Sequence, residues 1–222
     1  RLPADAVSAP AAIMPDLAQS ADFRVRVLGE VDDPVLFGQG ELRGLGSWAQ
    51  GASSAVGSFF LKGRDLMLID GLAFKGGSTV NVPVAAVDLD NRQVDAVVST
   101  QGFSLSDLPG ISGINGQVSG TAIVSADLSG ETPRLSAQGV LTDGTFASGG
   151  YQASDTSGAF SFDGNQMIIP DGYASFEGSR VKLAGVFDLR NQALDFSARS
   201  DSLNLAAFGL PGESAAVVGS IS

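Results

Sequence analysis

The side chains of this chain that could do chemistry are mostly carboxylates, and their densest group lies around Asp88. Asp88, Asp90 and Asn91 are nearly consecutive, and Asp95 follows shortly after. Hard oxygen ligands of this kind bind Ca²⁺. Asp and Asn are also the residues that tight turns favour, and Arg190 replaces Asp90 at the corresponding position about one hundred residues later. A turn is therefore favoured over a calcium site, and we expect no bound metal.

The other reactive residue types do not form a catalytic pattern. The chain has no His, which the usual Ser-His-Asp arrangement needs, and no Cys, which excludes thiolate metal sites and disulfides. Asp70 and Asp171 each precede a glycine and are typical of turns, and no spacing singles out a catalytic carboxylate pair. Gly38 and Gly40 lie in a strand pattern with no helix after it, so they do not form a dinucleotide loop. We expect a protein without enzymatic activity and without a cofactor.

Composition limits the kinds of partner. The net charge is −11 and the 13 basic residues are scattered, which argues against nucleic acid and against docking on an anionic membrane. Hydrophobic residues make up 44% of the chain, enough for a folded domain, yet no run approaches the roughly 18 residues that cross a bilayer. The chain begins at Arg1 without a visible leader, so we expect an internal fragment of a longer protein.

The chain repeats itself at a period of about one hundred residues, which indicates stacked units that share one core. The matching sets are Gly57, Phe59, Leu61, Gly63, Leu66, Leu68 and Asp70 in the first copy and Gly158, Phe160, Phe162, Gly164, Met167, Ile169 and Asp171 in the second.

Beyond residue 21 the hydrophobic pattern has period two, which is typical of half-buried strands. Phe23, Val25 and Val27, for example, alternate with Arg24 and Arg26. No window has a sustained helical period, and only single turns are expected, near 104–108 and 202–208.

Two kinds of hairpin turn recur. A glycine in the first position of a two-residue turn at Gly63-Arg64 predicts a type II′ hairpin with Leu61 opposite Leu66. The counterpart in the second copy is Gly164-Asn165, with Phe162 opposite Met167.

An asparagine begins the second kind of turn. Asn91-Arg92 predicts a type I′ hairpin with Leu89 opposite Val94. The counterpart is Asn191-Gln192, with Leu189 opposite Leu194 and Phe187 opposite Phe196.

The strand before Asn91 changes its pattern. Val82 and Val84 occupy even positions, whereas Val87 and Leu89 occupy odd ones. One inserted residue restores the inward side, so we expect a β-bulge near residues 85 and 86 that is absent or displaced in the second copy.

These patterns predict an all-β fold: an open-ended, curled, mainly antiparallel sheet built from about two repeats of roughly 100 residues. Val217, Gly219 and Ile221 echo Val118 and Gly120 and suggest that a further repeat begins there. The expected divisions are a linker or short packed segment at 1–20, repeats at 21–118 and 119–213, and the start of a third repeat at 214–222.

A long sheet with one apolar side and no helix to cover it must pack on itself or hold something apolar. An ordinary packed core and a ligand-filled groove both fit this pattern, and the sequence alone leaves the choice open. The candidate lining residues are Phe59, Leu61, Leu66, Leu68, Val80, Val82, Leu89, Val94, Phe103, Phe160, Phe162, Met167, Ile169, Val181, Leu183, Leu189, Leu194, Phe196 and Leu203.

The second copy also resembles a known family, the TamB-type, AsmA-like envelope proteins of diderm bacteria. The first copy matches less well, with Lys62 in place of Asp163 and Val84 near the position of Gly185, and the resemblance covers most of residues 30–222. The residues that carry it are Pro133-Arg134-Leu135, Gly139-Val140-Leu141, Phe160-Ser161-Phe162-Asp163-Gly164, Gly178, Leu183, Gly185, Asp188 and Leu189.

The resemblance implies a taco-shaped or repeating β-groove in the periplasm, whose apolar interior conducts phospholipid between the inner and outer membranes. It also implies an anchoring helix outside this segment, a possible outer-membrane barrel partner of the Omp85 type, and no catalytic residue. The candidate lining residues carry over as apolar, inward positions.

We therefore expect a lipid-shielding segment. The alternatives are a scaffold for outer-membrane proteins that pairs with client strands through its sheet edges, a structural β-solenoid stalk with a filled core and, less favoured, a polysaccharide-active β-helix enzyme.

Overall fold

The computed structural model describes residues 18–30, 32–45, 52–107, 115–130, 134–148, 151–176, 178–188, 190, 193–203 and 215–221. Nearly all of these residues lie in strands, as the period-two pattern predicts.

The strands are long and follow one another with short connections. The first seven are β1 (Ala18–Gly29), β2 (Pro34–Leu45), β3 (Ala52–Lys62), β4 (Asp65–Lys75), β5 (Ser78–Asp88), β6 (Gln93–Ser104) and β7 (Asn115–Asp127). The others are β8 (Arg134–Ser148), β9 (Tyr151–Phe162), β10 (Gln166–Phe176), β11 (Ser179–Asp188), β12 (Ala193–Leu203) and β13 (Ala215–Ile221).

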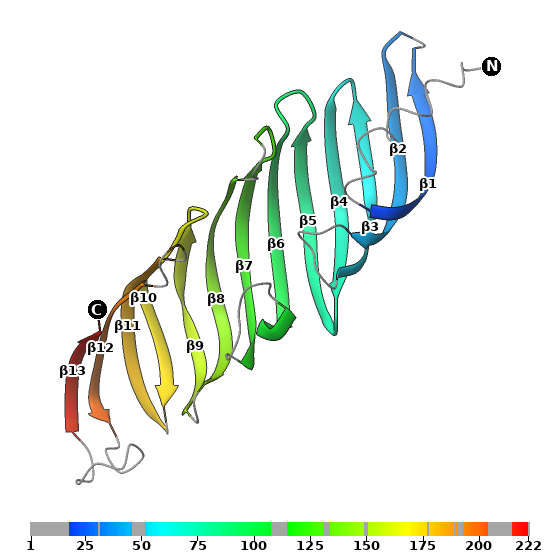
Figure 1. Ribbon diagram of the computed structural model, residues 1–222. Helices are drawn as coiled ribbons and strands as arrows, with labels where there is room; N and C mark the ends of the chain where they lie inside the picture. The colour runs from blue at the N-terminus through cyan, green and yellow to red at the C-terminus, as the bar shows by residue number, and fades with distance from the viewer. Residues whose placement is uncertain are drawn as a thin grey trace.

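All of them belong to one 13-stranded sheet in which strand order equals chain order (Figure 1). Every neighbouring pair is antiparallel, so the sheet is a continuous meander. The prediction of an all-β, open-ended, antiparallel sheet is confirmed.

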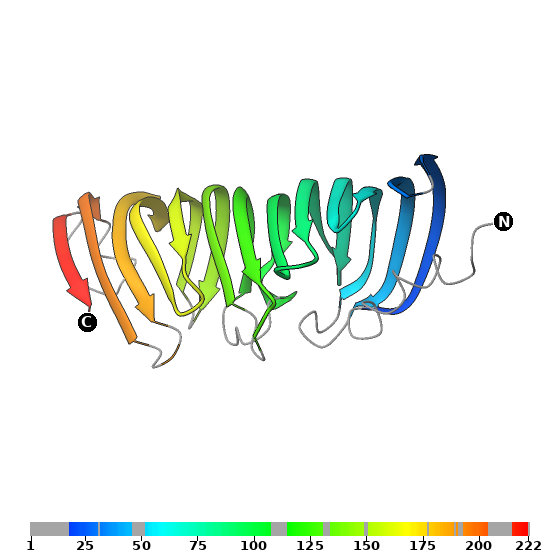
Figure 2. The same ribbon diagram turned by 90° about the horizontal axis from the view of Figure 1, so that it is seen from above.

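The expected curl of the sheet on itself is not found. Figure 2 shows the strands in a row with β1 and β13 at opposite ends. Because hydrogen bonds between the described strands join chain neighbours only, the sheet is not closed into a barrel, in agreement with the expected open end. The accessible surface is 14452 Å², well above the roughly 9500 Å² of a compact monomer of this mass.

The pairings predicted for the hairpins with a leading glycine are confirmed. Leu61 lies opposite Leu66, and Phe162 lies opposite Met167. Gly63 has a φ of 59°, the left-handed value that a glycine adopts without steric cost.

The hairpins with a leading asparagine were predicted in the wrong register. Val87, not Leu89, lies opposite Val94, because the connection is four residues long. The Asp88 carboxylate explains the longer turn, since it accepts the backbone N–H groups of Asp90 and Asn91 at 2.9 Å each.

The second copy shows the same error. Phe187, not Phe196, lies opposite Leu194. Asp188 again accepts a backbone N–H, here that of Arg190 at 2.9 Å. Leu189 lies outside the described residues.

The predicted bulge exists but lies slightly earlier in the strand. The register of β5 with β6 shifts between Asn81 and Val84, where Pro83 lacks the N–H that a ladder needs. In the second copy β11 pairs with β12 without a shift, so the absence of the bulge there is confirmed. The irregularity of β10 between Ile169 and Gly172 corresponds to one in β4 between Ile69 and Leu72.

One short helical element is described, the 3-10 turn η3 (Leu105–Asp107). It agrees with the turn predicted at 104–108, whereas the counterpart at 202–208 lies largely outside the described residues. No helix in the described part of the chain is long and apolar enough to cross a membrane.

The division into two repeats stays a prediction. The boundary between residues 118 and 119 falls inside β7, and the sheet continues through it. The strands β4, β5 and β6 begin at Asp65, Ser78 and Gln93, and β10, β11 and β12 begin about one hundred residues later, at Gln166, Ser179 and Ala193.

Candidate functional site

The strand registers assign each side chain to one of two faces, because side chains alternate along a strand and directly paired residues share a face. Phe59 pairs with Leu68, and Leu61 with Leu66, so these four residues lie on the same side. We name this side the apolar face and the opposite side the polar face.

The predicted lining residues that have described side chains within strands all lie on the apolar face. They are Phe59, Leu61, Leu66, Leu68, Val80, Val82, Val94, Phe103, Phe160, Phe162, Met167, Ile169, Val181, Leu183, Phe196 and Leu203.

The remaining three predicted positions differ. Leu89 is half-buried in the β5–β6 turn, outside the strand. The backbone of Leu194 pairs with Phe187 in β12, and Leu189 lies outside the described residues. Because the β5–β6 turn is longer than predicted, Val87 rather than Leu89 lies opposite Val94.

Bulges keep the apolar set on one side. Val94 and Phe103 have opposite parity, yet both face the same way, because the β6–β7 register shifts between Thr100 and Phe103. Gly102 occupies this bulge with a φ of 63°. A regular strand would have placed Phe103 on the opposite face.

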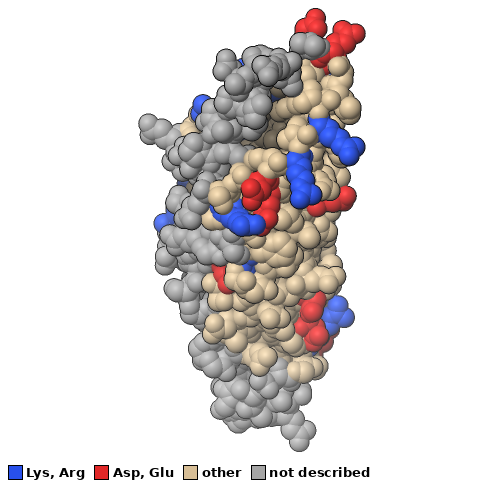
Figure 3. Space-filling model, turned by 90° about the vertical axis from the view of Figure 1, so that its right-hand side faces the viewer, with Lys and Arg blue, Asp and Glu red and all other residues tan. Residues whose placement is uncertain are grey.

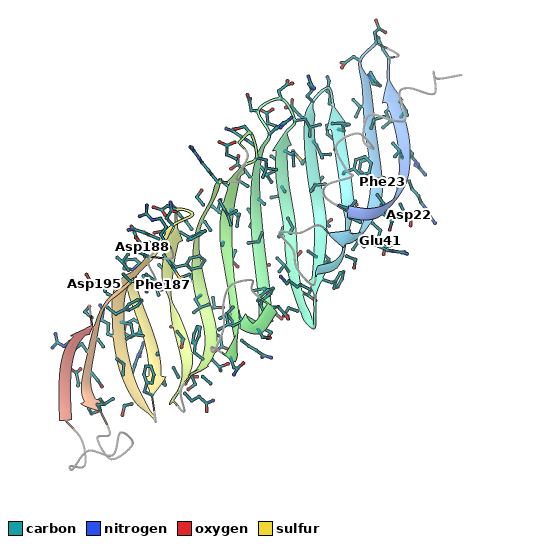
Figure 4. All side chains as sticks on the ribbon, in the orientation of Figure 1. Asp22, Phe23, Glu41, Phe187, Asp188 and Asp195 are labelled. Carbon is teal, nitrogen blue, oxygen red and sulfur yellow. The ribbon has the colours of Figure 1, made fainter. Side chains whose placement is uncertain are left out.

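The registers also sort the charges. Outside the bulges, the charged residues of the described strands lie on the polar face, with Lys75 at the end of β4 as the exception. Phe187 and Asp188 illustrate the sorting (Figure 4): Phe187 pairs with Met167 on the apolar face and Asp188 with Gln166 on the polar face. The apolar face is therefore almost free of charge from β1 to β12.

Burial differs between the two faces. Ala85, Phe103, Ala153, Ala174 and Val181 are buried, and all five lie on the apolar face. Large apolar residues are exposed on both faces. Those on the apolar face are Phe23, Val25, Val27 and Leu135, and those on the polar face include Phe37, Phe60, Met67, Leu72, Val84, Ile123, Val140 and Ile168. No large described side chain is fully buried, so the apolar face has no conventional core.

Glycines leave room for aromatic rings on the apolar face. A Cβ on Gly40 would lie 2.5 Å from the Phe23 ring, and one on Gly38 would lie 2.9 Å from the Phe59 ring. The two rings meet edge to face with centroids 5.7 Å apart. Gly185 likewise lies under a phenylalanine, since its Cβ would be 2.6 Å from Cγ of Phe196.

A row of glycines crosses the middle of the apolar face in both copies. Gly40 pairs with Gly57, and Gly158 pairs with Gly172. We name this set the glycine row; its members are Gly40, Gly57 and Gly71 in β2–β4 and Gly139, Gly158 and Gly172 in β8–β10. Sequence analysis used several of these glycines as repeat markers but missed that they share one face; the places of Gly71 and Gly172 on it depend on the bulges of β4 and β10.

The polar face is mixed in charge. The Arg180 guanidinium lies over the Tyr173 ring at 4.3 Å, and Lys182 Nζ lies 3.0 Å from Asp171 Oδ1. Figure 3 views the end of the molecule where β1 lies and shows acidic and basic side chains interspersed on its described surface.

The carboxylates around Asp88, which were considered as calcium ligands and assigned to a turn, form hydrogen bonds and ion pairs within the protein. Asp88 also accepts a hydrogen bond from Nδ2 of Asn91 at 2.6 Å. Asp90 forms an ion pair with Arg64 at 2.8 Å, and Asp95 accepts a hydrogen bond from the Ser125 hydroxyl. No group of three acidic residues in the described ranges is placed to hold a metal ion.

Turn carboxylates have lowered pKa values. The Arg190 side chain, together with the Arg190 backbone N–H, lowers the pKa of Asp188 to about 2. The backbone N–H groups of Gln166 and Asn165 lower the pKa of Asp163. These carboxylates therefore stay ionised and stabilise the turns by accepting hydrogen bonds from backbone N–H groups.

The chemistry that this arrangement supports is apolar binding. Each methylene transferred from water onto an apolar surface contributes about 0.8 kcal/mol, without any reacting group. Searches against protein-family models, curated proteins and solved structures find no match for this chain.

Proposed function

We propose that this chain is a non-enzymatic, lipid-carrying segment whose apolar face shields phospholipid acyl chains from water. The observation that carries the proposal is the nearly charge-free face that the registers maintain through every bulge from β1 to β12. An apolar surface of this length on a single-layer sheet favours an apolar occupant.

The proposal extends to the setting that the resemblance implies. The chain would be part of a TamB-type protein that spans the periplasm, conducts phospholipid between the inner and outer membranes, and works with an Omp85-type barrel. Lipid would move by diffusion along the apolar face, with direction supplied from elsewhere.

A photo-crosslinking residue at Phe162 tests the proposal without a disruptive charge. Phe162 lies on the apolar face, and Phe60, on the polar face and 37% exposed, is the matched control position. After incubation with phospholipid vesicles and irradiation, mass spectrometry should find lipid attached at position 162 and little at position 60.

Substitution gives a second measurement. Phe162→Asp and Leu183→Asp should each lower lipid capture at a crosslinker elsewhere on the apolar face by about tenfold or more, because an unpaired charge in an apolar contact costs more than the ~1.4 kcal/mol that corresponds to tenfold. Phe60→Asp should leave capture unchanged, and circular dichroism checks that each variant keeps its strands. Capture of protein clients in place of lipid at every apolar position would favour the scaffold alternative and overturn the proposal.

A further inference from the structure

The two long edges of the sheet differ in charge. The turns that join β1 to β2, β3 to β4, β5 to β6, β7 to β8, β9 to β10 and β11 to β12 all lie along one edge, which we name the hairpin edge (upper edge in Figure 1). Its described charged residues are Glu30, Asp32, Asp33, Lys62, Arg64, Asp65, Asp88, Asp90, Arg92, Asp127, Arg134, Asp163, Asp188 and Arg190.

The opposite edge carries fewer charges. Its described connections and terminal strand residues carry Lys75 and Asp107, and Arg43, Arg180 and Asp201 lie within two residues of a strand end. The sequence segments 46–51, 108–114 and 149–150 contain no charged residue, whereas Glu177 and Glu213 fall in the other connections of this edge. A charged headgroup would therefore meet complementary charge mainly at the hairpin edge.

The hairpin edge offers both signs of charge close together. Lys62 pairs with Asp33 at 3.2 Å and Arg190 with Asp188 at 3.2 Å. Arg92 and Arg134 form no ion pair among the described residues. Acidic residues outnumber basic ones, so the edge can receive an ammonium group and a phosphate together but disfavours a purely anionic group.

The apolar face is graded from this edge inward. The side chains nearest the hairpin edge are mostly large, and the glycine row lies farther from this edge. The side chains nearest the edge are Val27, Leu36, Leu61, Leu66, Val87, Val94, Ala126, Leu135, Phe162, Met167 and Phe187. From Leu61 to Gly57 the strand rises roughly 14 Å. That depth matches one leaflet of acyl chains, about half of a ~30 Å hydrocarbon core.

We infer that the hairpin edge seats the headgroups of zwitterionic phospholipids, whose acyl chains lie along the strands of the apolar face as far as the glycine row. The inference rests on the proposed function. The carboxylates attract the headgroup ammonium, and Arg92 and Arg134 attract its phosphate. An anionic headgroup that lacks an ammonium group is repelled by the excess of carboxylates at the hairpin edge and has no positive group to pair with them.

The experiment uses the crosslinker at Phe162 and vesicles with equal amounts of phosphatidylethanolamine, phosphatidylcholine and phosphatidylglycerol. Each zwitterionic lipid should be captured about 2- to 5-fold more than the anionic lipid, the range that exposed charge pairs supply. A crosslinker at Phe146, on the apolar face beyond the glycine row, should capture less lipid than one at Phe162.

A charge variant tests the edge itself. Asp65→Asn with Asp90→Asn should raise the captured share of phosphatidylglycerol. Asp143→Asn with Asp171→Asn removes the same charge from the polar face away from this edge and should leave the share unchanged.

The outcomes separate the two proposals. Three results would each overturn this inference and leave the proposed function standing. They are lipid capture at Phe162 without a headgroup preference, stronger capture at Phe146 than at Phe162, and an equal response of the two charge variants. No lipid captured anywhere on the apolar face overturns the proposed function itself.

Discussion

At the scale of single residues, the carboxylates of this chain build turns. Asp88, Asp163 and Asp188 each accept backbone N–H groups from the residues that follow. Sequence analysis identified such residues as turn formers but missed how a carboxylate lengthens a turn. The hydrogen bond from the backbone N–H to the carboxylate favours a longer turn over a two-residue one. The spacing of apolar residues along the sequence does not show which of the two turns forms.

The ionisation of Asp188 is a testable consequence at this scale. Its pKa of about 2 lies below the ordinary value of about 3.9, so the ionised form stabilises the folded turn. This contribution is complete above about pH 4 and is lost as the pH falls through about 2. Carboxyl NMR titration should show the low midpoint, and Arg190→Ala should raise it toward the ordinary value.

Lys182→Ala is the control for this titration, since it removes a similar exposed cation that pairs with Asp171 instead. A midpoint of Asp188 that is unchanged in Arg190→Ala would contradict the assignment of the shift to Arg190.

At the scale of strands, bulges decide which side chains share a face. The period-two pattern identified strands such as β4 and β11 and the parity change within β5. It placed the β5 bulge too late in the strand, because it took no account of Pro83, which cannot donate a ladder hydrogen bond. Two members of the glycine row, Gly71 and Gly172, could not be predicted, because they reach the apolar face only through the bulges of β4 and β10.

Close packing around Gly139 gives a prediction for the strands. A Cβ at this position would lie 2.4 Å from the backbone oxygen of Thr121 and 2.8 Å from Cβ of Ala122. Gly139→Ala should therefore lower the free energy of unfolding by about 1–3 kcal/mol, measured by denaturant unfolding.

Gly77→Ala is the matched control, because a Cβ there meets no atom within 4 Å. Equal stability of the two variants would contradict close packing at Gly139.

At the scale of the whole molecule, the sheet is extended. Strand order equals chain order, and thirteen strands at about 4.8 Å spacing span roughly 58 Å. The unpartnered area of this single layer makes both faces available to other molecules, and the charge sorting makes the two faces chemically different.

Small-angle X-ray scattering tests this shape. The strand lengths and spacing predict a radius of gyration near 20 Å or above for the monomer, whereas a compact chain of this length has about 17 Å. Measurement over a dilution series excludes self-association as the cause. A value near that of a compact chain would mean that the sheet folds over and covers the apolar face.

The sequence by itself determined the strands, the antiparallel hairpins and the apolar set, because period-two alternation and turn residues act over short distances. Only the tertiary structure decided that Val94, Phe103 and Phe162 share one nearly charge-free face, that the sheet stays open, and that charge gathers along one edge. These properties depend on the register of each strand with its neighbours, and a single bulged residue such as those at Pro83 or Gly102 reverses the face of everything beyond it.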